Sequence, residues 1–563
     1  MFKRIFLAAA VLVAAAAVFV ALTLPPRRQQ LQSIGDGTVA GIVHVHTNRS
    51  DGRSSPDEIA AAAAHAGLKF VVFTDHGDAT RRPDPPMYRS GVLCLDATEI
   101  STNQGHYVAL GLPPAPYPLA GDARDVVEDV KRLGGFGIAA HPDSPNPKLA
   151  WREWTAPFDG IELLNPDTSW RALAYEPGFQ AKRRLVTALV DYPFRPVETI
   201  AHELRDSRSI ASWQALAPRR RVVAIGGVDA HAKLQLGRAD DSPWLPFFGY
   251  ESAFRLMSVH VSLGDPLTGN ASTDGDLLLR AIRAGHLYTA VDGVATPPAF
   301  EFFAANNRDT VHEGDEMEAG GGVAIHVRSN APPAFTTVLH RGTSILATAR
   351  DAGDWTVHAP EAPAVYWVEI RAPQQARPMT WLRSNPIYIR ASLTPPAARE
   401  SAAGQVVRRL LDDSSTNGWQ VEHDPASLGA MEVTKESSGP ELLFQYTLGG
   451  GTPSTQTTAL AYATRTGVAD SNRVAFRIRA DHPMRISVQL RAKNADRWQR
   501  SVYVDHDAQD RVVGFDDMTP VGNASPASPP RSDIITLLFV VELTNTKPGT
   551  SGRVWLSEVR FER

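Results

Sequence analysis

Apolar segments that end in histidine, aspartate or glutamate recur through the first half of this chain, and they limit its fold more than any other feature. The first runs from Gly41 to Gly52, where His44 and His46 stand two residues apart among aliphatic residues and Asp51 follows in a loop. In a strand, side chains at i and i+2 point to the same face. This spacing predicts two imidazoles side by side at a strand end, an arrangement that suits a divalent ion. Taken alone, the pair is equally well explained by two core or surface histidines beside an ordinary turn.

The next segment predicts a helix followed by a second strand. Ser55 is a candidate N-cap, with a proline after it and Glu58 completing a capping box. The alanine-rich run ends at Gly67, and the apolar segment 70–76 then ends in His76. A strand–helix–strand order is typical of parallel sheets, in which sites form at the carboxyl ends of the strands. His76 and His46 are therefore expected at the same edge of a sheet.

Polar residues continue to follow or to end apolar segments further along the chain: Glu99, His141, Asn165, Asp229 and His231. His106 stands at the start of a further predicted strand, 105–111. Burying such side chains repeatedly without partners would cost free energy. Chance placement of these residues in a hydrophobic core is therefore a poor explanation for the whole set. The joint pattern predicts a metal centre assembled from several strand ends. Other histidines of this region are expected to pack or to face solvent: His65, His202, His260 and His286.

The motifs that carry this pattern are His44-Val-His46, Ser50-Asp51-Gly52, Thr74-Asp75-His76, Glu99, His141-Pro142 and Asp229-Ala-His231. They resemble the motifs of the PHP (polymerase and histidinol phosphatase) metallohydrolases over about residues 40 to 300. The resemblance implies a distorted (β/α)7 barrel that holds two to three divalent ions, Mn, Zn or Fe. The segment from Asp276 to Tyr288 is similar to the end of the CehA/McbA-like subfamily, whose names attach to carbamate hydrolysis.

Carried over by position, the resemblance assigns one ion to His44, His46, Glu99 and Asp229. Glu99 would bridge to a second ion, held also by His106 and His141. The third ion would be held by Asp51, His76 and His231. Some PHP phosphatases carry a histidine where this chain has Asp51, and a carboxylate there favours a harder metal such as Mn²⁺.

Three further residues receive expected roles around the ions. Asn165 stands at a strand end and is a candidate substrate contact. Arg49 lies in the ligand loop, where it is either a phosphate contact or an ordinary surface arginine. Asp75 adjoins His76 and points the other way in a strand, so it is expected to support the site rather than to bind an ion.

The resemblance predicts a divalent-metal-dependent hydrolase in which a metal-activated water, and no side chain, is the nucleophile. A phosphoester is the expected bond, and an amide or carbamate is the alternative. A non-catalytic, surface-anchored binding protein is the third hypothesis. The partner expected of the barrel is a small-molecule substrate. The net charge of −4 gives no electrostatic case for nucleic acid as a partner.

The N-terminus predicts a location outside the cytoplasm. Lys3 and Arg4 precede an uncharged run from Ile5 to Leu24, and basic residues follow it. As a helix this run would be about 30 Å long, which is one hydrocarbon thickness of a bilayer. We expect residues 1–37 to be a signal anchor and linker, with the protein secreted if the segment is cleaved. The compartment would be the periplasm or the cell surface.

The remaining sequence predicts two β domains after a barrel at 38–298. Short alternating strands favour an Ig-like β-sandwich at 299–393, followed by a linker at 394–405. A second set of strands at 406–563 resembles galactose-binding-like jelly rolls of the carbohydrate-binding type, so a glycan is a candidate partner. Trp419, Trp498 and Tyr503 are candidates for an aromatic platform, although core packing is expected for at least one of them.

Overall fold

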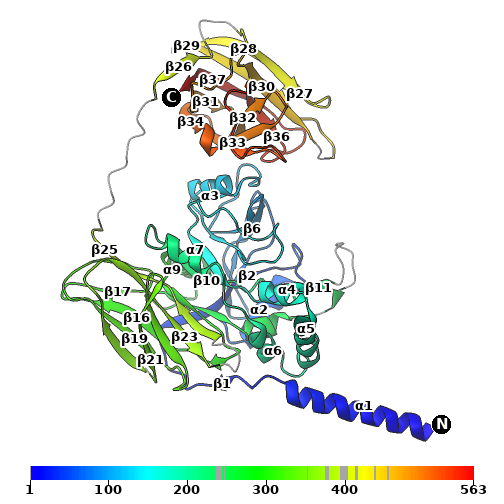
Figure 1. Cartoon of the computed structure of the whole chain (residues 1–563), viewed down its shortest axis with the longest axis vertical. Helices are drawn as coiled ribbons and strands as arrows, with labels where there is room; N and C mark the ends of the chain where they lie inside the picture. The colour runs from blue at the N-terminus through cyan, green and yellow to red at the C-terminus, as the bar shows by residue number, and fades with distance from the viewer. Residues whose placement is uncertain are drawn as a thin grey trace. The chain divides into compact units, whose positions relative to one another are not determined.

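The computed structural model of this chain describes residues 2–235, 244–245, 247–351, 353–373, 379–393, 404–411, 416–436, 439–452 and 455–563. It shows a multidomain protein rich in β-sheet, with two compact units (Figure 1). One unit comprises Met1–Pro113 and Asp122–Pro395, and the other comprises Pro114–Gly121 and Pro396–Arg563. The boundary expected at 298–299 therefore falls inside the first unit. Most of the expected linker, 394–403, lies outside the described residues.

The helices of the described residues all belong to the first unit, apart from a single 3-10 turn at Phe515–Asp517. Their bounds are α1 Phe2–Thr23, α2 Pro56–His65, α3 Ala123–Arg132, α4 Pro166–Tyr175, α5 Phe179–Asp191, α6 Pro196–Glu203, α7 Ile210–Leu216, α8 Tyr250–Phe254 and α9 Ala271–Ala284. The predicted capping box of α2 is confirmed, because Ser55 and Glu58 cap each other's backbone N–H groups. In the described part of the chain, no helix combines the length and apolar character needed to cross a bilayer.

Two sheets position the candidate ligands. The strands of the first are β2 Thr38–Val45, β3 Phe70–Phe73, β4 Met87–Arg89, β5 Val92–Asp96, β13 Ser258–Ser262 and β14 Leu287–Ala290, and those of the second are β6 Thr98–Thr102, β7 Gly105–Leu110, β8 Phe136–Ala139, β9 Gly160–Leu164 and β10 Val223–Gly226. The first sheet runs β14-β13-β2-β3-β5-β4 and the second β10-β9-β8-β7-β6. Both sheets are mixed. In the first, β2, β3 and β5 pair in parallel and β13 pairs antiparallel with β2. In the second, β6, β7 and β8 pair antiparallel, and β8, β9 and β10 pair in parallel.

Two isolated parallel bridges join the first sheet to the second. Val45, at the end of β2, bridges to Ala230 just beyond β10, and His76, beyond β3, bridges to Glu99 in β6. Further backbone hydrogen bonds support the first junction, including Val228 N–H to the Val43 carbonyl at 3.0 Å. Each bridge therefore sits among residues that the sequence predicts to be metal ligands.

The β-rich region after β14 continues the first sheet rather than starting a separate one. Its strands are β15 Ala295–Thr296, β16 Phe300–Ala305, β17 Thr310–His312, β18 Glu316–Glu318, β19 Ala324–Ser329, β20 Thr336–Arg341, β21 Ser344–Arg350, β22 Asp354–His358, β23 Ala364–Ala372, β24 Met379–Ser384 and β25 Ile387–Arg390. Strand β24 pairs with β14, with Tyr288 opposite Ser384. A 4-stranded sheet, β17-β16-β19-β22, and the extended sheet share a core that includes Phe302, Ile325 and Trp381. This region is thus a β-sandwich joined to the preceding sheet through main-chain hydrogen bonds.

Two further strand pairs lie at the edges of the first unit. β1 Gln29–Gln30 pairs in parallel with β15, and β11 Leu234–Gln235 pairs with β12 Trp244–Leu245.

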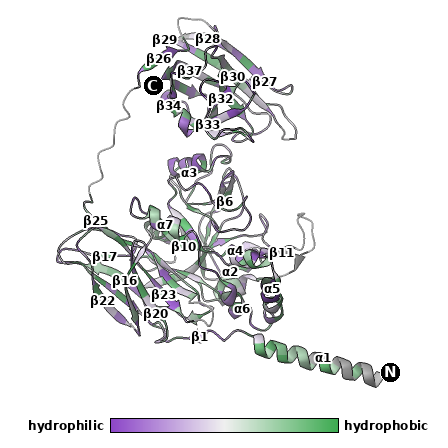
Figure 2. Ribbon diagram, in the orientation of Figure 1, coloured by the Kyte–Doolittle hydropathy of each residue, from purple (hydrophilic) through white to green (hydrophobic). Residues whose placement is uncertain are grey.

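The second unit is a β-sandwich of two 6-stranded sheets, counted over the described residues. Its strands are β26 Val406–Arg409, β27 Trp419–His423, β28 Leu428–Glu436, β29 Gly439–Thr447, β30 Thr457–Ala463, β31 Arg473–Ala480, β32 Met484–Ala492, β33 Arg497–Val504, β34 Gln509–Gly514, β35 Thr519–Pro520, β36 Ile534–Glu542 and β37 Ser551–Glu562. Its strands alternate apolar and polar residues, and the apolar ones form the core (Figure 2). Trp419 and Trp498 belong to this core and are 5% and 0% exposed. The expected aromatic platform is therefore wrong for these two residues, because both side chains are buried in the core, and the expectation of core packing for at least one of the three is confirmed.

Asn385 joins the β-sandwich to β10 and β14, and its loss is expected to destabilise the first unit. Its side chain is fully buried, accepts a hydrogen bond from Ala224 N–H at 2.8 Å and donates to the carbonyls of Ala224 and Leu287 at 2.8 and 2.9 Å. Asn385→Ala leaves these backbone groups unpaired, so we expect the free energy of unfolding to fall by about 3 kcal/mol. Urea titration followed by tryptophan fluorescence measures the change. Asn307→Ala, at an exposed position of the same unit, is the control and should change little.

Candidate metal centre

Four predicted ligands converge on one point at the junction of the two sheets. His44 Nε2 lies 3.3 Å from Glu99 Oε2 and 3.4 Å from Asp229 Oδ1. His46 Nε2 lies 3.1 and 3.3 Å from the same two oxygens. Ligands about 2.1 Å from a tetrahedral ion are about 3.4 Å apart, so these spacings fit one divalent ion. The residues of this group are those expected to hold the first ion.

Three of these ligand atoms are buried without a hydrogen-bond partner: His44 Nε2, His46 Nε2 and Glu99 Oε2. The side chains of all three residues are at most 1% exposed. Buried polar atoms are normally paired, because an unpaired one costs about 1–3 kcal/mol. Unpaired atoms of this kind that face one another fit a cation among them.

The second oxygen of Glu99 faces a different pair of imidazoles. Glu99 Oε1 lies 2.8 Å from His106 Nδ1 and 2.8 Å from His141 Nε2. The two oxygens of this carboxylate thus address two neighbouring groups of histidines. This placement is compatible with a carboxylate shared between two ions. The residues that could hold one ion are grouped differently from the expected second set, however: His76 joins Glu99 and His106, with His76 Nδ1 3.2 Å from Glu99 Oε2, and His141 joins Glu99 and His44.

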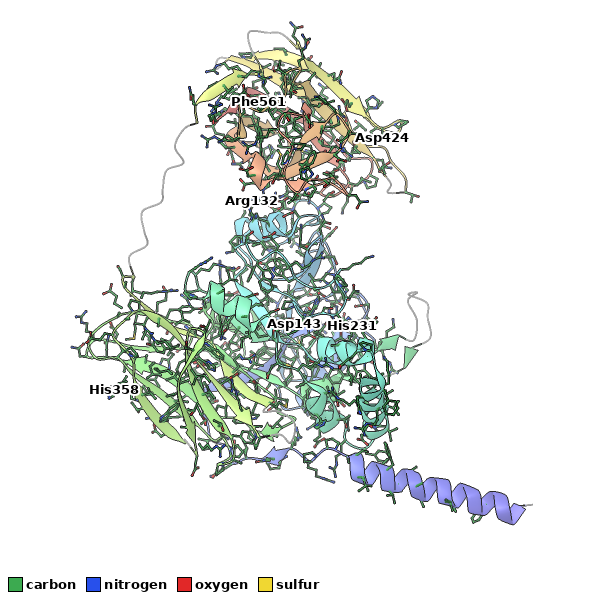
Figure 3. The ribbon with its side chains drawn as sticks, viewed as in Figure 1. Arg132, Asp143, His231, His358, Asp424 and Phe561 are labelled. Carbon is green, nitrogen blue, oxygen red and sulfur yellow. The ribbon has the colours of Figure 1, made fainter. Side chains whose placement is uncertain are left out.

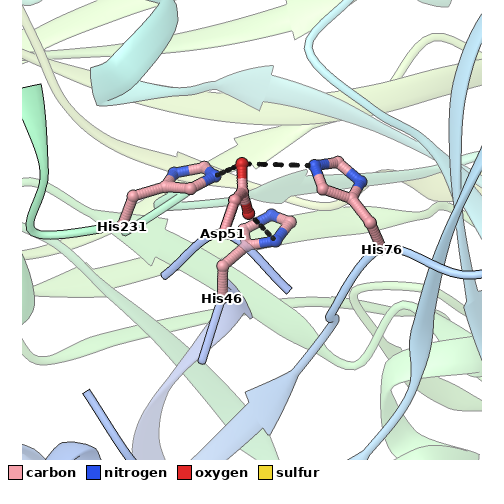
Figure 4. A group of neighbouring side chains, drawn as sticks. All are labelled: His46, Asp51, His76 and His231. Carbon is pink, nitrogen blue, oxygen red and sulfur yellow. Dashed lines mark ion pairs between the residues drawn. The ribbon is translucent and has the colours of Figure 1, made fainter. Parts of the chain in front are cut away.

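A third group lies at the more exposed side of the centre (Figure 4). Asp51 Oδ2 is 3.2 Å from His231 Nε2 and 3.7 Å from His76 Nε2, and Asp51 Oδ1 is 3.4 Å from His46 Nδ1. The Asp51 side chain is 51% exposed, whereas His46 is fully buried. Sequence reasoning predicts three of these residues together. The structure adds His46, which offers one ring nitrogen to this group and the other to the first group.

Three of the candidate ligands have a strained backbone conformation. His44, His141 and Asp229 have φ values of +66°, +27° and +52°, in a region that favours glycine. A non-glycine residue held there costs about 1–3 kcal/mol and persists only where the surrounding structure enforces it. The strain therefore marks positions where side-chain direction matters more than local backbone preference.

Glu162 of β9 is a functional residue that sequence reasoning missed. Its Oε1 lies 2.5 Å from His44 Nδ1, and its Oε2 accepts a hydrogen bond from His141 N–H at 2.7 Å. Glu162 is 3% exposed and orients the imidazole of His44, as carboxylates commonly do for histidine ligands. The available signal was a charged residue between Ile161 and Leu163 in an otherwise apolar strand.

Asp75 supports the ligand loop, as expected. Its carboxylate accepts hydrogen bonds from Thr47 N–H at 2.8 Å, Thr47 Oγ1 at 2.7 Å and Ser50 Oγ at 2.6 Å. The buried carboxylate thereby fixes the loop that carries Asp51.

The two candidate substrate contacts have other partners in the structure. Asn165 caps α4, accepting a hydrogen bond from Thr168 N–H at 2.8 Å, and donates to Glu162 Oε2 at 3.1 Å. Arg49 pairs with Asp84 and lies 3.6 Å from Asp96 Oδ2. Their contacts to a substrate stay predictions. Asn165 retains access to one, because it lines a cavity.

A cavity of about 460 Å³ opens beside the ligands. His141, Glu162 and Asn165 line its inner side, and Asp143, labelled in Figure 3, lies on its wall. Loop residues Arg205 and Arg208 line it as well. The cavity therefore reaches the centre at His141, the one candidate ligand among the described residues of its lining.

The electrostatics of the centre show that carboxylates and imidazoles are balanced against each other. Burial disfavours the charged form of His46, but the adjacent negative charges of Asp229 and Glu99 raise its pKa to about 10. Burial likewise disfavours the Glu99 carboxylate, yet the surrounding imidazoles, above all His44, lower its pKa well below the usual range. The carboxylates are thus ionised and ready to bind a cation, while protons occupy nitrogens that an ion would use.

The other histidines of this region have different surroundings. His260 stacks on Tyr288 at 4.6 Å, and burial lowers its pKa to about 4. His286 pairs with Asp315 at 2.9 Å, and His65 and His202 are exposed on α2 and α6. None of them joins the groups of potential metal ligands found among the described residues.

Comparisons with known proteins give few relatives. No family model matches the chain. A protein of Methanocaldococcus jannaschii described as uncharacterised is 29% identical over 140 residues, which is 22% of this chain and 80% of that protein.

Among solved structures, the family 11 carbohydrate-binding module of a Clostridium thermocellum cellulase matches 29% of this chain and 96% of its own, with 11% identity and a TM-score of 0.23. The family 11 module from the same organism, in complex with a mixed-linked tetrasaccharide, covers 29% and 97%, with 14% identity and a TM-score of 0.24. At these scores, fold and function must be argued from the residues of this chain.

Binding of an ion is expected to release protons. Below about pH 10 the metal-free His46 imidazole carries a proton on each ring nitrogen, and the proton on Nε2 must leave before that nitrogen can bind an ion. Affinity for Mn²⁺ or Zn²⁺ should therefore rise with pH up to about 10. Isothermal titration calorimetry at pH 7 in two buffers of different ionisation enthalpy measures the protons released. Equal heats in both buffers would contradict the expectation.

Gly227 is expected to be essential for the orientation of His44. A Cβ at this position would lie 1.8 Å from Glu162 Oε1 and 3.1 Å from the His44 Cβ. Gly227→Ala should displace the Glu162 carboxylate and lower metal affinity about 10- to 100-fold. Metal content after dialysis against a weak chelator gives the measurement. Gly249→Ala is the matched control, because a Cβ there meets nothing within 4 Å.

Proposed function

We propose that this chain is a divalent-metal-dependent hydrolase that acts on a phosphoester. The observation that carries the proposal is the convergence of unpaired, buried ligand atoms from His44, His46 and Glu99, with Asp229 completing the group. A purely structural cluster would pair these atoms with each other or with backbone groups.

The resemblance to PHP metallohydrolases is part of this proposal. It is supported by the order in which strands meet: β2 and β3 in the first sheet, β6 to β10 in the second, and bridges at both junctions. Such an order is compatible with a distorted (β/α)7 barrel whose ligands gather at strand ends.

The three groups of ligands would hold two to three ions. His44, His46, Glu99 and Asp229 would hold one, Glu99, His106 and His141 a second, and Asp51, His76 and His231 a third. His46 would bind the first ion through Nε2, and its Nδ1 would orient Asp51. When bound, such ions activate a water as nucleophile and neutralise charge that develops on the substrate.

The chain's own residues position and enclose the substrate. Glu162 orients His44 through its Nδ1 and leaves its Nε2 free to bind an ion. Asp75 holds the loop that carries Asp51. Arg208 is exposed on the cavity wall and supplies a cation for an anionic group of the substrate. This cation favours a phosphoester over the neutral amide or carbamate, which the same ions are able to hydrolyse.

Removal of one ligand from either of two groups should abolish turnover. We expect His141→Ala and Asp229→Asn each to reduce kcat/KM by more than about 100-fold, because each leaves a group of ligands incomplete. The assay uses the Mn²⁺- or Zn²⁺-loaded full chain with nitrophenyl phosphate, a phosphodiester and an aryl carbamate.

His65→Ala provides the matched control, since this exposed histidine of α2 is outside the centre. Unchanged activity in either ligand variant would reject the site. Turnover of the carbamate alone would replace phosphoester hydrolysis by the alternative, and the absence of turnover together with less than about one bound ion per chain would reject the enzyme hypothesis.

A further inference from the structure

Exposed large apolar side chains are concentrated in two segments of the first unit. Among the described residues, eleven of the eighteen lie in α1 or between residues 175 and 194. Those of the second segment are Tyr175, Phe179, Val186, Leu189, Val190 and Phe194. Single exposed apolar residues are ordinary, but a contiguous group marks a surface that binds something.

The outer face of α5 carries most of this group. Phe179, Val186 and Val190 stand at i, i+7 and i+11, so they form one stripe along the helix. They are 79%, 55% and 36% exposed. The opposite side is the packed one, because Ala181 and Ala188 are buried there. The apolar stripe is therefore not the face by which α5 joins the fold.

The chain leaving α1 is fastened to the C-terminal end of α5. Thr23 Oγ1 donates to Asp191 Oδ1 at 2.8 Å, and the Arg195 guanidinium donates to the carbonyl of Pro25. The end of α1 next to this junction carries exposed Phe19 and Leu22 and is coloured as hydrophobic in Figure 2. Two apolar helical surfaces thus adjoin each other on one side of the unit.

Basic residues accompany the apolar stripe. Lys182 and Arg183 are exposed on the first half of α5, and Arg27 is exposed beyond the end of α1. The only carboxylate within α5, Asp191, is buried and accepts the hydrogen bond of Thr23. An apolar face flanked by lysine and arginine is typical of helices that lie in the interface of an anionic bilayer.

We propose that the outer face of α5, together with Phe194, is a docking surface for a bilayer that contains anionic phospholipid. Phe179, Val186 and Val190 enter the boundary between headgroups and acyl chains, and Lys182 and Arg183 contact the phosphates. The surface is separate from the metal centre, and the proposal does not depend on the hydrolase function.

The test places a fluorophore on this face in the full chain. Val186→Cys is labelled with an environment-sensitive nitrobenzoxadiazole dye, and Ile345→Cys is the matched control, since these positions are 55% and 54% exposed. The native Cys94 is buried, and the unsubstituted chain measures its labelling. The proteins are added to vesicles of phosphatidylcholine and phosphatidylglycerol that contain a brominated, quenching phospholipid.

We expect at least twofold quenching at position 186 and none at position 345. Lys182→Glu with Arg183→Glu should remove most of the quenching at 186, as should replacing phosphatidylglycerol by phosphatidylcholine. Equal signals at 186 and 345 would overturn the proposal. In the unlabelled Val186→Cys variant, a disulfide between the introduced thiols of two chains, with a dimeric mass in the absence of lipid, would also overturn it in favour of a second copy as the occupant.

Discussion

The Glu99 carboxylate is the element on which the candidate centre depends. One oxygen faces His44 and His46, and the other faces His106 and His141, so a single side chain connects two groups of ligands. Its position is fixed by the bridge between His76 and Glu99, where the two sheets meet. The geometry of the centre is therefore a consequence of how the sheets join. Displacement of β6 relative to β3 would open both groups at once.

Much of the centre could be predicted from the sequence because strand ends are visible in it. A run of apolar residues that closes on His46, His76 or His141 implies where the side chain must emerge. The role of Glu162 could not be predicted in this way, because it depends on the contact of its side chain with His44, a residue over a hundred positions away in the sequence. The same holds for His46, whose second nitrogen meets Asp51 only because the loop between them folds back on Asp75.

The fold was predictable in its elements and less so in their connections. Alternation of apolar and polar residues indicates the strands of both β-sandwiches, and the capping residues indicate α2. The pairing of strands from different predicted domains depends on residues far apart in the sequence. No local sequence pattern indicates that β24 pairs with β14 and continues its sheet. Trp419 and Trp498 show the same limit, because a tryptophan in a strand has the same local pattern whether it faces the core or a ligand.

The shared sheet also limits how this chain can be divided into parts. Strand β14 pairs with β13 along one edge and with β24 along the other. The Asn385 side chain also donates a hydrogen bond to the carbonyl of Leu287, at the start of β14. A gene fragment ending after β14 would leave a bare strand edge, a known template for unwanted association between chains. The region that carries the candidate ligands and the β-sandwich that follows it are therefore one structural piece, and neither is expected to fold with its native edges if it is expressed alone.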